Sequence, residues 1–258
     1  MNAWQKGLIF TAAVMALTLI YAILFSRTPV PEGAVPLRDI VSYCIGDVTD
    51  DGVPELLAIA GDGKIDSGER HGQLLLICEA SSLEDLDKLG YLPFEKIQHN
   101  IDLTGIMPVK VQIGDVNGDG INEIALCVYK TAKFHPVMAK RPFFFDLVEG
   151  NLIPLWLGSR LSRPFDDYIL RDIDADGIDE IISVELLEDG KRVIAVYDWS
   201  GFGFEMFTQS EDFDGELRFD AGSGGHSEIG VIFSVDKEHS KLNFSLKDGN
   251  LVYSIVNL

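Results

Sequence analysis

Three short segments of the chain carry oxygen-bearing side chains at one shared spacing around a glycine. They are Asp47–Glu55, Asp115–Glu123 and Asp172–Glu180. Each segment has Asp at its first and fifth positions, Gly at the sixth and Glu at the ninth. Calcium is a hard cation that takes about six to eight oxygen ligands, and a tight turn can gather several carboxylates around one ion. The shared spacing therefore predicts up to three Ca²⁺ sites.

The predicted ligands are the side chains at positions 1, 3, 5 and 9 of each loop and the backbone carbonyl at position 7. They are Asp47, Thr49, Asp51, Val53 and Glu55; Asp115, Asn117, Asp119, Ile121 and Glu123; and Asp172, Asp174, Asp176, Ile178 and Glu180. An EF-hand would need helices on both sides and a Glu at position 12, where this chain has Ala58, Leu126 and Ser183, so that motif is excluded.

Two alternatives to calcium stay open for these loops. A metal-free turn, closed by hydrogen bonds from Asp side chains to the backbone, would use the same residues. This alternative is strongest for the first loop, because Thr49 is a weaker ligand at position 3. Magnesium fits less well, since it prefers a tighter octahedron and retains water.

Apolar runs on both sides of each loop predict strands. Alternating residues precede the loops, as at Val109–Ile113, and short continuous runs follow them, as at Leu56–Ala60 and Ile181–Val184. This is the pattern of strand, acidic turn and strand. Further hairpins are predicted at Phe143–Leu147 with Leu152–Leu157, Arg192–Asp198 with Phe204–Phe207, and Leu242–Leu246 with Leu251–Ile255, and one short helix is predicted at Ser81–Leu89.

The repeated pattern predicts an all-β fold. Units of about 60 residues, each worth roughly four strands, are typical of β-propeller blades. The stretch 37–258 has room for about four such units. The fourth unit, after Ser210, is expected to have lost the metal loop, because Asp212–Gly215 keeps a glycine turn but not the ligand spacing.

The loop pattern resembles the FG-GAP or VCBS-type repeat, which occurs in the propeller of integrin α-subunits and in many bacterial surface proteins. The resemblance rests on Asp-x-[Asn/Asp/Thr]-x-Asp-Gly-x-x-Glu-[Leu/Ile] in three loops and their strands. It implies calcium bound between blade strands, and a propeller that serves adhesion or recognition. The Phe-Gly and Gly-Ala-Pro elements that name the family are absent, and about four units stand where integrins have seven.

An apolar run near the N-terminus, Leu8–Phe25, has no charged residue and is flanked by Lys6 and Arg27. A secretory signal has an apolar core of roughly 7–15 residues and a small-residue cleavage site. This run is longer and approaches the roughly 30 Å of a bilayer core as a helix. We therefore expect a membrane anchor in residues 1–27, a Pro-rich linker in 28–36 and the repeat domain in 37–258; a cleaved signal is the alternative.

The flanking charges do not settle the orientation in the membrane. Resting cytosolic calcium is too low to fill weak sites, whereas extracellular modules bind at about 10⁻⁴–10⁻³ M. The domain is therefore expected on the extracytoplasmic side of the cell membrane, held by a single span.

The chain is strongly acidic, with 21 Lys and Arg against 41 Asp and Glu and a net charge of −20. Nonspecific binding to nucleic acid is excluded, because a phosphate backbone would be repelled. The sign reverses locally between residues 130 and 171, which predicts a face for an anionic polymer, lipid headgroups or an acidic protein; scattered solvated charges are the alternative. The residues of this face are Lys130, Lys133, Lys140, Arg141, Arg160 and Arg163.

No catalytic motif stands out. The five histidines lack metal-ligand spacing, and neither a nucleophile elbow nor a P-loop is present. The Gly-rich segment Gly222–His226 is interpreted as a hairpin loop. We expect a binding, adhesion or structural module at the cell surface rather than an enzyme. The alternatives are an exported propeller enzyme acting on polysaccharide or phosphate esters, and a subunit of a larger membrane assembly.

Overall fold

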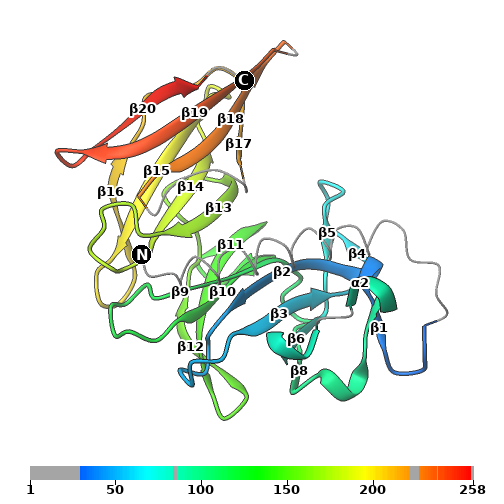
Figure 1. Ribbon diagram of the computed structural model, residues 1–258. Helices are drawn as coiled ribbons and strands as arrows, with labels where there is room; N and C mark the ends of the chain where they lie inside the picture. The colour runs from blue at the N-terminus through cyan, green and yellow to red at the C-terminus, as the bar shows by residue number, and fades with distance from the viewer. Residues whose placement is uncertain (1–29, 84–85, 221–226, 237, 257–258) are drawn as a thin grey trace. The chain divides into compact units, whose positions relative to one another are not determined.

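The computed structural model describes residues 30–83, 86–220, 227–236 and 238–256. Strands make up most of this part of the chain (Figure 1), which confirms the all-β prediction. Within these ranges there are six sheets, four of them four-stranded and two of them two-stranded pairs. The predicted anchor, 1–27, lies outside the described residues. Within the described ranges, no helix is long and apolar enough to cross a bilayer.

The first four-stranded sheet has the order β2-β3-β6-β8, with antiparallel neighbours. Its strands are β2 (Ile40–Gly46), β3 (Glu55–Ala60), β6 (Leu74–Glu79) and β8 (His99–Asp102). Small elements surround it: β1 (Val35–Pro36) with β7 (Tyr91–Leu92), β4 (Gly63–Lys64) with β5 (Arg70–His71), α2 (Leu86–Leu89), and the 3₁₀ turns η1 (Leu37–Asp39), η2 (Ala80–Leu83) and η3 (Phe94–Lys96).

Three further sheets follow, each made of four consecutive strands in chain order. The second holds β9 (Pro108–Gly114), β10 (Glu123–Ala132), β11 (His135–Val148) and β12 (Asn151–Leu157). The third holds β13 (Phe165–Arg171), β14 (Glu180–Leu186), β15 (Arg192–Trp199) and β16 (Phe204–Gln209). The fourth holds β17 (Glu216–Phe219), β18 (Ile229–Val235), β19 (Glu238–Lys247) and β20 (Asn250–Val256).

The predicted hairpins and loop-flanking strands are all present in these sheets. The predicted helix at Ser81–Leu89 is only partly confirmed, because the described residues form η2 and the single turn α2. Within the predicted linker, Val35 and Pro36 pair with Leu92 and Tyr91 as strand β1. The four-stranded units agree in number with the four predicted.

The inner strands of each sheet supply the core. All six residues of β3 are buried, and so are the first six of β14. Strands covered on both faces read as continuous apolar runs rather than as alternating ones, which explains why Leu56–Ala60 has no polar residue. In β14 the buried Ser183 interrupts the run, and its hydroxyl donates to the carboxylate of Glu185 at 3.2 Å. The apolar run after each loop is therefore a consequence of double-sided burial.

The described chain divides into two compact units. One comprises residues up to Val111 with Leu126–Tyr129 and Leu147–Leu152, and the other comprises Gln112–Ala125, Lys130–Asp146 and Ile153–Leu258. In the first, Leu56, Ala58, Leu76 and Cys78 pack in one core. In the second, the third and fourth sheets share a core that contains Ile182, Val196, Val231, Leu242 and Phe244.

The three cysteines form no disulfide. Cys78 and Cys127 are buried, and Cys44 is partly buried. Burial raises the pKa of the Cys78 thiol to about 12, so it stays protonated. Cys78 and Cys127 act as small apolar side chains of the core.

Candidate metal sites

Each acidic loop connects the first and second strands of its sheet. Asp47–Glu55 joins β2 to β3, Asp115–Glu123 joins β9 to β10, and Asp172–Glu180 joins β13 to β14. We call these loops 1, 2 and 3. The sheets that hold them are built in the same way, so the loops occupy equivalent places in successive units. The shared sequence pattern between predicted strands leads us to expect these equivalent places.

The backbone of each loop folds around its first and fifth carboxylates. The Asp at position 1 accepts a hydrogen bond from the glycine N–H at position 6, and the Asp at position 5 accepts one from the N–H at position 7. The first bond measures 2.8 Å for Gly52 to Asp47, 2.9 Å for Gly120 to Asp115 and 3.2 Å for Gly177 to Asp172. The second measures 2.7 Å for Val53 to Asp51, 2.9 Å for Ile121 to Asp119 and 2.8 Å for Ile178 to Asp176.

The backbone conformation at position 6 explains why each loop has a glycine there. Gly52, Gly120 and Gly177 have φ values of +81°, +89° and +97°, in the region that other residues rarely adopt. The turn can then fold back so that positions 1 and 5 approach each other. Replacing this glycine would strain the backbone without removing any ligand.

The Glu at position 9 is buried beneath each loop, at the start of the second strand. Its Oε2 accepts the backbone N–H of position 2, at 3.0 Å from Val48 to Glu55 and 2.9 Å both from Val116 to Glu123 and from Ile173 to Glu180. The second carboxylate oxygen is directed elsewhere. In loops 1 and 2 it accepts a hydrogen bond from position 3, at 3.1 Å from Thr49 Oγ1 and 2.6 Å from Asn117 Nδ2.

Position 3 behaves differently in loop 3. Asp174 has no proton to donate in its ionised form, and its Oδ1 accepts the N–H of Asp176 at 3.1 Å. Burial and the neighbouring carboxylates of Asp176 and Asp172 raise the pKa of Asp174. Loop 3 therefore gathers negative charge that loops 1 and 2 partly replace with neutral hydrogen-bond donors.

Two acidic clusters among the described residues could hold a metal ion. Carboxylate oxygens of Asp47, Asp51 and Glu55 all lie within 4.8 Å of one another, and so do those of Asp172, Asp174 and Asp176. In loop 2, Asn117 replaces a carboxylate, and Asp115, Asp119 and Glu123 do not form a cluster this tight. The donors are all oxygens, which is the ligand type that hard divalent cations prefer.

The structure adds a further acid to each site that the sequence interpretation missed. The third strand of the sheet brings Glu79, Asp146 or Asp198 to the loop. Glu79 lies opposite Glu55 in the β3–β6 register. Asp146 interacts electrostatically with Asp119 and Glu123, and Asp198 with Asp174, Asp176 and Glu180. Only the strand register brings these acids to the loops, because in the sequence each acid comes many residues after its loop.

Burial raises the pKa values of the acids around loops 2 and 3, and neighbouring carboxylates add to the effect. Burial is the main cause for Glu123, whose pKa rises from 4.5 to about 7, and for Glu180, whose pKa rises to about 8; nearby aspartates add to both. Burial first, and then aspartates of the loops, also raise the pKa of Asp146 and of Asp198. A bound divalent cation would reverse these effects, since it favours the ionised forms.

Loops 2 and 3 are neighbours. The backbone N–H of Asp179 donates to the carbonyl of Asp115 at 2.7 Å. A Cβ placed on Gly114 would lie 2.4 Å from Asp179 Oδ2, and one on Gly118 would lie 2.7 Å from Cδ1 of Ile178. Glycine at both positions lets the loops pack together. An ion bound in one loop would therefore also stabilise the conformation of the other.

The fourth sheet requires a correction to the sequence interpretation. Its first and second strands, β17 and β18, are joined by residues 220–228, so the equivalent loop is not at Asp212–Gly215. The strand pair that closes this connection is Phe219 with Val231, twelve residues apart, whereas Gly46 pairs with Glu55 and Arg171 with Glu180, nine residues apart. The fourth connection is therefore longer than the three acidic loops, and its residues 221–226, which include the predicted Gly222–His226 loop, lie outside the described residues.

A lysine lies beside the first acid of this fourth loop. Lys241 Nζ is 2.9 Å from Asp220 Oδ2, and both side chains are largely covered. Lys241 comes from β19, the third strand of its sheet, which in the other sheets supplies an acid. The fourth unit therefore neutralises the carboxylate that follows its first strand with an ammonium group of the chain itself.

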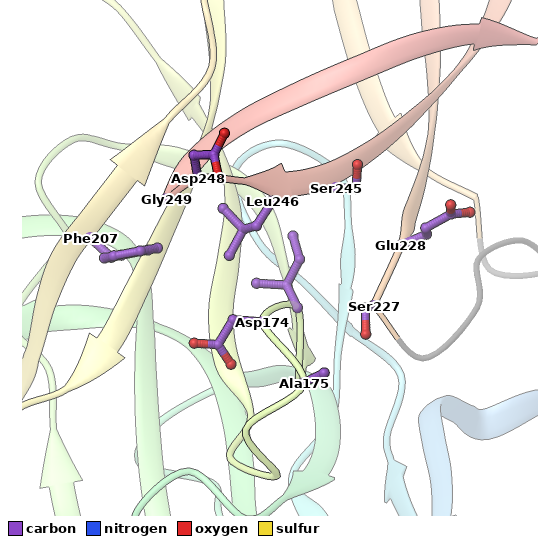
Figure 2. Close-up of a pocket in the computed structure, with 10 residues that line it drawn as sticks. Asp174, Ala175, Phe207, Ser227, Glu228, Ser245, Leu246, Asp248 and Gly249 are labelled. Atoms are coloured by element: carbon purple, nitrogen blue, oxygen red, sulfur yellow. The ribbon is translucent and has the colours of Figure 1, made fainter.

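Loop 3 also borders a surface pocket of about 530 Å³. Figure 2 shows Asp174 and Phe207 on one side of this pocket and Ser227 with Glu228 on the other. Leu246 lies between them, and Asp248 follows it in the β19–β20 turn. The carboxylates sit at different edges and do not converge on one point, so the pocket lacks the paired acids of a hydrolytic site.

The predicted basic face is smaller than its sequence suggests. Arg141 is wholly buried, and Arg163 forms an ion pair at 3.1 Å with the buried Glu185. Lys140 donates to the carbonyl of Asp166 at 2.6 Å. Arg160 and Lys133 are exposed and Lys130 is partly exposed. Arg141 is therefore excluded as a surface contact, and charge reversal at Arg163 would test folding rather than binding.

Comparison with models of known protein families gives no match, and a search of curated proteins gives no similar sequence. The functional argument therefore rests on the loops, the sheets that hold them and the surface of this chain.

Proposed function

We propose that this chain is a membrane-anchored, extracytoplasmic β-propeller whose acidic loops bind Ca²⁺, and that it acts as a binding or structural module at the cell surface. The observation that carries the proposal is the repetition of one loop design in three consecutive four-stranded units. In each loop a buried Glu, two Asp side chains and a further acid from the third strand approach one another. Repulsion among them is the property that a divalent cation would relieve.

The residues of the loops fit calcium better than the alternatives. Loops 1 and 3 each place three carboxylates within 4.8 Å, and calcium tolerates the irregular, mostly oxygen-lined geometry that such loops provide. The ligands expected to hold it are those at positions 1, 3, 5 and 9, with the acid of the third strand completing the set. Calcium would supply charge neutralisation and tie the first strand of each unit to the second.

The propeller arrangement is supported by the four four-stranded sheets in chain order and by the resemblance of the loops to FG-GAP or VCBS-type repeats. A role in recognition or adhesion is favoured over catalysis because the pocket beside loop 3 has dispersed carboxylates. The membrane location follows from the apolar run 8–25, and the extracytoplasmic side follows from the calcium concentration that such loops would need.

The proposal is tested by thermal unfolding of the purified full chain with Ca²⁺, with Mg²⁺ and with a chelator. Ligand at a hundredfold excess over its Kd stabilises the native state by about 2.7 kcal/mol per site, so calcium should raise the melting temperature and chelation should lower it. A chain in which Asp51, Asp119 and Asp176 are all changed to Asn should lose this difference. The matched control is Asp189→Asn, in the exposed β14–β15 turn. Identical melting curves in calcium and chelator would refute the calcium sites.

A further inference from the structure

The β10–β11 hairpin projects beyond the rest of its sheet. We call Lys130–Arg141 the basic hairpin. Pairing between β9 and β10 ends at the hydrogen bond from the Tyr129 N–H to the Met107 carbonyl. Pairing between β11 and the segment after β12 ends at the hydrogen bond from the Gly158 N–H to the Pro142 carbonyl. The seven residues His135–Arg141 thus extend past β12, over about 20 Å at the usual rise of a strand.

The tip of the basic hairpin is apolar and exposed. The turn is Lys133-Phe134, and Phe134 is 86% exposed, Val137 56% and Met138 38%. Tight hairpin turns usually use Gly, Asn or Asp, as this chain does at Glu149-Gly150 and Asp248-Gly249. The Lys133-Phe134 turn does not need a left-handed backbone, since neither residue has a positive φ, but a phenylalanine that is 86% exposed adds little to the core. These residues therefore indicate contact with something outside the chain.

The charge of the basic hairpin opposes that of the molecule. Four cations, Lys130, Lys133, Lys140 and Arg141, lie within it, and no acid occurs between Glu123 and Asp146, although the chain as a whole carries −20. Lys133 Nζ lies 5.5 Å from the Phe134 ring centroid, and Lys130 Nζ lies 5.6 Å from that of Phe143. Phe143 is buried, but Lys133 beside the exposed ring of Phe134 is an arrangement that suits a boundary between headgroups and acyl chains.

Arg141 holds the two strands of the hairpin together. Its Nε donates to the Lys130 carbonyl at 2.7 Å, and its Nη2 donates to the carbonyls of His135 and Val137 at 2.9 Å and 2.6 Å. Nη1 is buried and has no hydrogen-bond partner. The guanidinium thus contributes positive charge at the base of the hairpin and fixes the direction in which the tip points.

We propose that the basic hairpin docks on an anionic lipid bilayer, with Phe134, Val137 and Met138 entering the interfacial layer and Lys130 and Lys133 meeting headgroup phosphates. The acidic remainder of the molecule does not prevent this, because charges are screened over about 8 Å at physiological salt. Each lysine near an anionic surface strengthens binding about fivefold. This inference rests on the membrane location in the proposed function: a linker of residues 28–36 spans at most about 30 Å when extended.

Depth-dependent quenching tests the docking. The full chain, carrying Phe134→Trp, is reconstituted in nanodiscs that contain phosphatidylglycerol and brominated acyl chains. The matched control is Phe202→Trp, at the tip of the β15–β16 hairpin, where Phe202 is 81% exposed but Asp198 and Glu205 flank the turn. We expect bromine to quench the added tryptophan at 134 and to leave the one at 202 unquenched. Equal quenching at the two positions would overturn the proposal.

Charge variants test the part played by lysine. On the Phe134→Trp background, Lys130→Gln with Lys133→Gln should weaken docking about 25-fold and abolish most of the quenching. Lys64→Gln with Lys247→Gln changes the net charge equally at two exposed sites elsewhere and should leave quenching intact. Phosphatidylcholine-only discs should behave like the lysine variant. Quenching that survives both loss of the lysines and loss of anionic lipid would contradict an electrostatic contact.

The outcomes separate the docking from the anchor and from calcium. Failure of the chain to remain with the discs during purification would refute the anchor, and quenching measured with added vesicles then still decides the docking. The measurement in chelator should match that in calcium, because no acid of the loops belongs to the basic hairpin. Binding of soluble polyphosphate without quenching by brominated lipid would identify a soluble polyanion as the partner and overturn the lipid proposal.

Discussion

At the scale of single residues, the buried Glu at position 9 decides how each loop responds to its surroundings. Glu123 is 1% exposed and Glu180 5% exposed, and each faces two or more other acids. A carboxylate in this position is costly when it is ionised without a counter-ion. It is also the ligand that benefits most from a cation. Removing the charge of this Glu should therefore lower the free energy of unfolding when metal is bound, and leave it unchanged or raise it when metal is absent.

Glu180→Gln should separate these two effects. In chelator, the amide oxygen can still accept the Ile173 N–H while the buried charge is removed, so the free energy of unfolding at neutral pH should stay level or rise. In calcium, the variant should lose stability because one ligand charge is missing. Urea unfolding in both conditions measures the difference. Glu188→Gln, at an exposed position after β14, should change neither value; a loss for Glu180→Gln in both conditions would contradict the argument.

The pH dependence of the metal-free protein follows from the same groups. The folded pKa values of Glu123 and Glu180, about 7 and about 8, lie above the ordinary value of 4.5, so the folded state binds protons more tightly than the unfolded state. The free energy of unfolding in chelator should therefore fall as pH rises from 4.5 to about 8. Unfolding in urea at a series of pH values checks this. A stability that rises over the same range would show that these acids are not buried together.

Arg163 carries a separate structural prediction. Its partner Glu185 is fully buried and also accepts hydrogen bonds from Tyr197 and Ser183. Removing one member of a buried pair leaves the other charge uncompensated and costs about 3–5 kcal/mol; the partial exposure of Arg163 places the expected loss at or below the lower end. Arg163→Gln should thus lower the free energy of unfolding well beyond the exposed control Arg160→Gln. Equal effects in chemical denaturation would argue against the ion pair.

At the scale of elements, the sequence correctly predicts the structures that depend on patterns within a short stretch of residues. The strands around each loop and the three hairpins follow from apolar runs and glycine turns within short windows. The acids of the third strand were missed because they meet the loop only through strand register. Glu79, for instance, reaches Glu55 across β3 and β6. The connection in the fourth sheet could not be placed from the sequence, because it lacks the acidic spacing and its closing strand pair, Phe219 with Val231, is twelve residues apart instead of nine.

The contact between loops 2 and 3 depends on a glycine. A Cβ at Gly114 would lie 2.4 Å from Asp179 Oδ2 and 3.1 Å from Leu170 Cδ1, so Gly114→Ala should force the loops apart. Overpacking of this kind costs about 1–3 kcal/mol. Gly105→Ala is the control, because its added Cβ would meet nothing within 4 Å. Chemical denaturation of the two variants measures the difference, and equal stabilities would mean that the loops are not packed as described.

At the scale of the whole molecule, the units should differ in their dependence on ions. The first three sheets carry full acidic loops, whereas the fourth pairs Asp220 with Lys241. Hydrogen exchange compared in calcium and in chelator should therefore show protection that falls in β3, β10 and β14 and holds steady in β18 and β19. A uniform fall across all four sheets would mean that the fold responds as one cooperative unit, against this expectation.

The cysteine thiols have a consequence for the survival of the protein in its surroundings. Because Cys44, Cys78 and Cys127 form no disulfide, no covalent cross-link ties one described strand to another, although exported domains often depend on such links. If the acidic loops hold calcium as proposed, the cross-links of this domain are ionic and reversible. Proteases that cleave transiently opened chains would then act faster as calcium is withdrawn. The lifetime of the molecule would be set by the mineral content of its environment and not by its redox state.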